Sequence, residues 1–224
     1  EQPPAGRPPV AVKGPARFAG GLTLIVTQPV GEFRQYVGES VGLGGHALVG
    51  LVPNRALSLR VDGDVVQYGR QTRSLYVGGW SGVPLEEVTT NNIGSLLVGP
   101  QLAVPVGPVR PYVHGGIGFA YFNTGTKVEC GGCSDQYDDG SIWNRTHLGD
   151  ITLSYGGGGG IAFALGRGTD PVTLDLGARY QHNGNARYLR KGSIVDGTTG
   201  PTFTPIESEA NYLVYRLGVS VPVR

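Results

Sequence analysis

The chain has 224 residues, 39 of them glycine, and a formal net charge of only +1 at pH 7. So small a net charge, without a long basic run, argues against nucleic acid as a partner. The length suits a single domain, and every apolar run is shorter than the ~20 residues that a membrane-spanning helix needs. The glycines lie inside apolar stretches such as 40–52 and 155–165. This placement indicates bent, closely approaching strands rather than a collagen repeat or a disordered chain.

The first fifteen residues differ from the rest because they contain five prolines and no periodic pattern. We expect residues 1–15 to be an extended Pro-rich segment and residues 16–224 to form one barrel domain. The sequence has no methionine, as expected of a secreted chain whose signal peptide has been removed.

Strand-like segments follow one another along the rest of the chain. We predict eight, at 16–27, 40–52, 55–69, 91–104, 110–123, 148–165, 171–183 and 210–223. The connections alternate strictly between long and short, beginning and ending with a long one. In an up-and-down barrel this order puts all short turns at one end and four long loops at the other, an asymmetry typical of outer-membrane barrels.

Within the strands, apolar residues alternate with small or polar ones, clearly so in 57–65, 172–181 and 213–221. A soluble sheet also alternates, but its polar face carries many lysines and glutamates, whereas here the second set is mostly Gly, Ser, Thr and Ala. The pattern therefore favours an aliphatic, lipid-facing outside and a narrow polar lumen. We predict an all-β, eight-stranded antiparallel transmembrane barrel with short periplasmic turns and four long external loops; a soluble barrel or sandwich is the alternative.

Three segments resemble strands of the OmpA-like small outer-membrane barrels: VGPQLAVP at 98–105, VRPYVHGGIGFAYF at 109–122 and VYRLGVSV at 214–221. The resemblance covers about 16–223 and implies a bacterial outer-membrane location. That family includes structural barrels, small pores, adhesion-related proteins and a few lipid-modifying enzymes, so it specifies fold better than activity. The chain departs from the family at 221–224, where Val-Pro-Val-Arg replaces the usual terminal aromatic residue.

The alternation places charges of both signs on the inward face. They are Arg60, Asp62, Asp64, Asp175, Arg179 and Arg216. Isolated charges in a narrow lumen would be costly, so we expect a paired network. The network is interpreted as a structural plug, with an ion gate as the alternative.

Aromatic residues gather near the strand ends, where a membrane girdle of amphipathic rings is expected. They are Phe18, Tyr68, Tyr76, Trp80, Tyr112, Tyr121, Phe122, Tyr180, Tyr188 and Tyr212. For Tyr76, Trp80 and Tyr188, packing within loops is an equal alternative.

Histidines are the first residues to consider for catalysis. The alternation points His46 and His114 inward and leaves His147 and His182 near the outer rim. Lipid-modifying barrels use a rim histidine together with a serine or an acid. His182 has no adjacent serine, and His147 lies in a loop beside Thr146 and Asp150. A catalytic triad is recognised by geometry rather than composition, so no catalytic residue is predicted.

The third long loop holds the only two cysteines, Cys130 and Cys133. In an oxidising location such a pair favours a local disulfide, with a redox or metal site as the alternative. Nearby carboxylates do not have the spacing of a calcium loop and are interpreted as a solvated tip: Glu129, Asp135, Asp138 and Asp139. We predict neither a metal nor a cofactor.

The sequence thus predicts a non-enzymatic outer-membrane barrel with a structural or surface-contact role, because an eight-stranded interior is about wide enough for side chains alone. Its partners would be outer-membrane lipid and, through the long loops or residues 1–15, a cell-surface partner or a second copy of the chain. A narrow passive pore, a self-assembling surface subunit and a soluble small-ligand-binding barrel are the alternatives.

Overall fold

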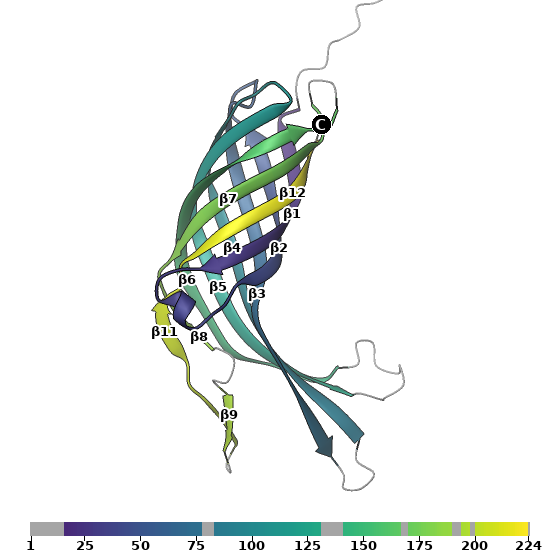
Figure 1. The fold of residues 1–224 in the computed structure, drawn as a ribbon, viewed down its shortest axis with the longest axis vertical. Coiled ribbons are helices and arrows are strands. Elements are labelled where there is room, and N and C mark those ends of the chain that lie inside the picture. Colours follow the sequence, from purple (N-terminus) through teal and green to yellow (C-terminus); the bar gives the residue numbers. More distant parts are fainter. Residues whose placement is uncertain are drawn as a thin grey trace, which may run out of the picture.

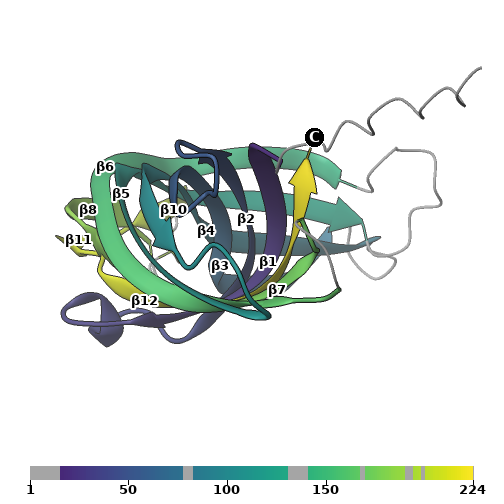
Figure 2. The same cartoon turned by 90° about the horizontal axis from the view of Figure 1, so that it is seen from above.

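Eight long strands close into one antiparallel barrel, as the sequence predicts (Figures 1 and 2). The computed structural model describes residues 16–77, 83–130, 141–166, 170–189, 194–197 and 200–223. The barrel strands are β1 (Phe18–Pro29), β2 (Ser40–Gly50), β3 (Leu57–Val77), β4 (Val83–Ala103), β5 (Val109–Cys130), β6 (Ser141–Ala164), β7 (Thr173–Asn183) and β12 (Tyr212–Val223). The remaining elements are a 3-10 turn, η1 (Phe33–Gln35), and short strands β8 (Asn185–Tyr188), β9 (Ile194–Gly197), β10 (Gly200–Phe203) and β11 (Ile206–Glu209).

Each barrel strand pairs with its neighbour in the chain, and β1 pairs with β12 over its whole length to close the barrel. The short connections β2–β3, β4–β5 and β6–β7 lie at one end together with the C-terminal end of β12, and the long connections lie at the other (Figure 1). We call these the short-turn end and the loop end. No helix among the described residues is long and apolar enough to cross a membrane.

The outward face of the barrel is a band of exposed aliphatic and aromatic side chains, including Leu22 and Leu24 on β1 and Leu217 and Val219 on β12. Among the described residues, no outward position in this band carries Asp, Glu, Lys or Arg. At the loop end the band gives way to polar outward residues: Gln28, Gln67, Asn92, Asn123 and His182. A strand as long as β12, rising ~3.3 Å per residue and tilted by about 40°, spans about 30 Å along the barrel axis, enough for a lipid-facing belt about 25 Å tall.

Four strands run much further than the sequence suggested. The β2–β3 pairing stops at Val41–Gln67, whereas β3 and β4 stay paired to Val77–Val83. Strands β5 and β6 continue in the same way, to Glu129–Ser141. Two long hairpins therefore project from the loop end (Figure 1). The segments expected as loops at 70–90 and 124–147 are largely strand, because beyond the lipid neither face needs to be apolar and the alternating signal disappears.

Inward glycines let neighbouring strands lie unusually close. A Cβ on Gly158 would overlap the carbonyl of Ala178 on β7, and a Cβ on Gly99 would overlap that of Gly115 on β5. Outward Gly157, by contrast, would meet only an ordinary contact, 3.5 Å from the carbonyl oxygen of His114. The high glycine content thus serves the tight curvature of a small barrel on its concave side.

Candidate functional site: a closed lumen

The middle of the lumen is filled by charged side chains from three strands. Alternation on β3 turns Arg60, Asp62 and Asp64 inward, β7 supplies Arg179, and β12 supplies Arg216; all five are buried. We call these five residues the lumen cluster. In the strand order around the barrel, β3 and β7 are four places apart and therefore face each other. The contact between Arg179 and Asp64 consequently crosses the lumen from wall to wall.

Two carboxylates hold three guanidinium groups. Arg60 donates from Nε and Nη2 to the two oxygens of Asp62, at 2.8 and 2.9 Å. Arg179 Nη2 donates to Asp64 Oδ2 across the lumen at 2.6 Å, and Arg216 Nη1 forms an ion pair with Asp62 Oδ1 at 2.6 Å. Weaker ion pairs at 3.7 Å join Arg179 to Asp62 and Arg216 to Asp64. Each carboxylate therefore contacts more than one arginine.

Amide side chains extend the cluster along the barrel. Arg60 Nη1 donates to Gln101 Oε1 at 2.7 Å, and Arg179 Nη2 donates to Gln181 Oε1 at the same distance. Gln181 in turn donates to Ser154 Oγ at 2.9 Å. Several N–H groups of Arg179 and Arg216 take no hydrogen-bond partner among the described residues, so attraction between charges holds this part of the cluster.

The sixth predicted lumen charge, Asp175 on β7, lies apart from the two central carboxylates. Its Oδ1 accepts a hydrogen bond from the Tyr112 hydroxyl at 2.8 Å, and the Arg60 guanidinium lies 5.6 Å from the centre of the Tyr112 ring. Tyr112 fits because two neighbours lack side chains: a Cβ on Gly160 or on Gly177 would collide with its hydroxyl. The sequence pattern did not single out Tyr112 or Gln101 as partners of the charges.

The loop end of the lumen is closed by packed aromatic rings. Phe33 of η1 is 1% exposed and packs edge-on against Tyr188 of β8, with ring centres 5.2 Å apart. Its other ring neighbours are Tyr68, Phe122 and Tyr212, at 6.1, 6.3 and 6.4 Å. We call these five residues the aromatic plug. Aliphatic side chains from four barrel strands complete this core: Ile25, Val66, Ile93 and Val214.

The girdle prediction is therefore wrong for Tyr68, Tyr112, Phe122 and Tyr212, whereas for Tyr188 the alternative of packing within the loops holds. Tyr112, Phe122, Tyr188 and Tyr212 are each 5% exposed or less and point into the lumen or its cap. The exposed members are Phe18, Tyr121 and Tyr180. The side chains of Tyr76 and Trp80 lie outside the described part of the chain. Strand parity gives the physical reason, because Tyr212 lies at the same parity as inward Arg216.

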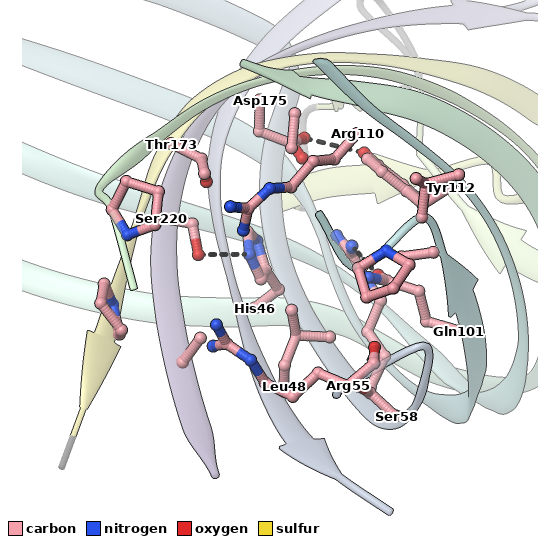
Figure 3. A pocket seen from close by; sticks show the side chains of 18 of the residues that line it. His46, Leu48, Arg55, Ser58, Gln101, Arg110, Tyr112, Thr173, Asp175 and Ser220 are labelled. Atoms are coloured by element: carbon pink, nitrogen blue, oxygen red, sulfur yellow. Dashed lines mark hydrogen bonds between the residues drawn. The ribbon is translucent and has the colours of Figure 1, made fainter. Parts of the chain in front are cut away.

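At the short-turn end, the lumen opens into a small cavity of about 90 Å³ with a mixed polar and apolar lining, which we call the vestibule (Figure 3). The Arg60, Tyr112 and Asp175 side chains are among its lining. Because Arg60 belongs to the lumen cluster, the vestibule borders directly on that cluster. His46 lies in its wall, with Nε2 3.3 Å from Ser220 Oγ. The vestibule is thus a blind space that ends at the cluster.

The histidine and cysteine predictions have different outcomes. His46 and His114 are buried and inward, and His182 packs against Tyr155 with ring centres 4.7 Å apart and the rings tilted. The side chain of His147 lies outside the described part of the chain. The His46 Nδ1 has no hydrogen-bond partner among the described residues, so the His46–Ser220 contact has no carboxylate to orient it. Cys133 lies outside the described residues, so its disulfide with Cys130 stays a prediction. The parts of the chain that are described hold no group of three His, Cys, Asp or Glu residues suited to a metal.

Neither a protein-family model nor a curated protein matches the sequence. Solved structures do resemble the fold. Neisserial surface protein A is 14% identical, with a TM-score of 0.44, and the match covers 94% of this chain and all of that one. Ail, the attachment invasion locus protein of Yersinia pestis, is 10% identical over 94% and 99% of the two chains, with a TM-score of 0.43. OprG from Pseudomonas aeruginosa is 13% identical over 93% and 96%, with a TM-score of 0.47.

At these identities the likeness concerns architecture only. The closed eight-stranded barrel of this chain agrees with the architecture that the OmpA-like resemblance of the sequence implied.

Proposed function

We propose that this protein is a bacterial outer-membrane barrel that is closed to solutes and acts at the cell surface through strands projecting from its loop end. One observation carries the proposal: the lumen is obstructed at two separate levels, by the lumen cluster and by the aromatic plug. A passive pore needs a continuous polar path, whereas here the charged lumen cluster and then the apolar aromatic plug interrupt the path.

The central obstruction is strong because its contacts cross the lumen. An ion passing between β3 and β7 would have to separate Arg179 from Asp64, which lie 2.6 Å apart and are almost fully buried. Breaking a buried pair of this kind costs about 3–5 kcal/mol. The cluster therefore acts as a brace between opposite walls rather than as a ring that an ion can pass.

The loop-end obstruction is of a different kind. Passage there would require Phe33 to leave contacts with four rings, three of them on barrel strands. The β8–β11 hairpin covers the same core with Ala186 and Tyr188, whose phenol hydrogen-bonds to Ser208 at 2.8 Å. The outer side of this hairpin carries exposed Arg187 and Glu207. The β8–β11 pair, which we call the cap, is therefore apolar towards the lumen and charged towards solvent.

The surface role rests on the projecting hairpins. Strand β3 continues about ten residues past the polar edge of the band at Gln67, which corresponds to roughly 30 Å of extended chain. Ladder pairs such as Arg73–Glu87 keep it joined to β4 over that length. A paired, polar structure of this reach is suited to contact outside the lipid headgroups.

Conductance tests the closed lumen. The purified barrel, refolded into planar lipid bilayers, is expected to give no discrete current steps. The Phe33→Ala variant is expected to stay silent because the lumen cluster remains, whereas Phe33→Ala combined with Arg179→Ala and Arg216→Ala should conduct. Regular current steps from the unaltered protein would establish the narrow-pore alternative instead.

Shortened hairpins test the surface role. Replacing residues 71–89 by Asn-Gly joins the paired residues Arg70 and Thr90 through a two-residue turn. Replacing 126–145 in the same way joins Gly125 to Thr146, which are also partners. Bacteria displaying the shortened barrel should adhere less to host cells or matrix than those displaying the full chain, at equal surface amount. Equal adhesion would remove the surface-contact role while leaving the closed lumen untouched.

A further inference from the structure

The vestibule ends blindly at the lumen cluster, but its lining also suits the binding of a small ligand. Its walls come from all eight barrel strands and from the three connections at the short-turn end. Serine, threonine and glutamine side chains line it at several heights, among them Ser58, Gln101, Thr173 and Ser220. A cavity of about 90 Å³ with such a lining has room for a small polar group but not for a lipid chain or a sugar.

The charges around the vestibule are unequal. Three arginines line it, Arg55, Arg60 and Arg110, against a single carboxylate, Asp175. Arg60 is neutralised by Asp62 below it, and Asp175 accepts the Tyr112 hydroxyl. Arg55 is paired with Asp170, so the uncompensated positive charge near the mouth belongs to Arg110.

These two arginines have donors to spare. Arg55 gives one nitrogen, Nη2, to Asp170 at 2.9 Å. Arg110 donates from Nε to the carbonyl of Gly107 at 3.0 Å, and neither of its terminal nitrogens has a partner among the described residues. Figure 3 shows both side chains at the pocket, with the His46 ring between their ends in this view. A guanidinium held through Nε presents its terminal N–H groups as a fork, which matches the geometry of a carboxylate or phosphate.

We propose that the vestibule binds one small oxyanion, a phosphate or a carboxylate group, between Arg110 and Arg55 at the short-turn end. The hydroxyls of Thr173 and Ser220 line the same space as further donors. Because the lumen cluster closes the floor, the site is reached only from the side of the membrane on which the short turns lie. The inference does not depend on the surface role.

Titration followed by nuclear magnetic resonance tests the site. The barrel is held in micelles of an uncharged maltoside detergent, so that no lipid phosphate competes. Inorganic phosphate and acetate are added separately at constant ionic strength, with chloride as the reference. Saturable shifts of the backbone amides of Ser58, Gln101 and Thr173 are expected with at least one probe, and the better probe identifies the group as phosphate or carboxylate.

Three variants separate a built site from general electrostatics. Arg110→Gln should weaken binding about tenfold or more, because one charge-assisted contact is lost. Arg34→Gln removes the same charge from η1 at the loop end and should leave the titration unchanged. Ala162→Leu fills the vestibule while keeping every arginine, and should abolish saturation. The heat-dependent gel mobility of each variant reports that the barrel is folded.

Two results would overturn the proposal. One is the absence of saturable shifts with either probe in the unaltered protein. The other is an equal effect of Arg34→Gln and Arg110→Gln, which would mean that the anions respond only to overall charge.

Discussion

The cross-lumen contact between Arg179 and Asp64 gives the sharpest stability prediction. Replacing Arg179 by leucine keeps much of the side-chain volume but removes the donor that lies 2.6 Å from Asp64 Oδ2 and 2.7 Å from Gln181 Oε1. The side chain is 1% exposed, so water does not replace the lost contacts. The Asp64 carboxylate is then left buried without its main partner.

The size of the stability loss depends on which partners Asp64 keeps in the Arg179→Leu variant. Losing one partner of a buried pair costs about 3–5 kcal/mol. Arg216 Nη2 already lies 3.7 Å from Asp64 Oδ1 and can move closer, so we expect the lower end, about 3 kcal/mol. For a chain of this length that corresponds to a fall in melting temperature of about 6–12 °C.

The assay is urea unfolding of the barrel in lipid vesicles, followed by tryptophan fluorescence and by gel mobility without boiling. The double variant Asp64→Leu/Arg179→Leu removes both charges and should cost less than the sum of the single variants, since no orphan charge remains. An Arg179→Leu midpoint equal to that of the unaltered protein, or strictly additive single effects, would refute the idea that this pair braces the lumen.

Three further predictions concern other parts of the barrel. Gly158→Ala should lower stability by about 1–3 kcal/mol because its Cβ would press on the neighbouring strand, whereas outward Gly157→Ala should change it by less than about 0.5 kcal/mol; urea unfolding compares the two. Leu217→Arg, on the lipid-facing band, should lower the free energy of unfolding in vesicles by about 2–4 kcal/mol if residue 217 lies near the bilayer midplane. A smaller loss would place residue 217 nearer to the membrane surface. Burial raises the pKa of the Tyr188 phenol, so the cap keeps its full contribution below the ordinary value near pH 10 and loses it as the pH rises further. Near-ultraviolet circular dichroism should show this alkaline loosening, and Tyr188→Phe should lack it.

The barrel could be predicted from the sequence because successive residues of a strand face lipid and lumen in turn, so apolar and polar residues alternate. In 57–65 that alternation puts leucine and valine outside and Arg60, Asp62 and Asp64 inside, and the structure has the same faces. The partners could not be predicted. Which arginine meets Asp64 depends on how far the strands are staggered when the barrel closes, and no local pattern records that offset.

The plug shows a second limit. Phe33 is an aromatic residue in a polar connection, between Gly31, whose φ is +61°, and Gly38. Period-2 reasoning applies only within strands, so nothing marked this residue as the centre of a core. For Tyr212 the sequence did hold a signal, because strand alternation puts it on the same face as inward Arg216. Its assignment to the aromatic girdle ignored that alternation.

The glycines and the charges of the lumen depend on each other. An eight-stranded barrel has an interior just wide enough for side chains, and this one holds three arginines and a tyrosine. Such large groups fit only where the neighbouring strand has no side chain. A Cβ on Gly44 would press on the Asp64 carboxylate, and one on Gly160 would press on the Tyr112 hydroxyl. Trimming the arginines would therefore leave a glycine-lined space rather than a repacked core. The paired charges therefore close the middle of the lumen. Their removal should open that level before the walls collapse, while the aromatic plug still closes the loop end.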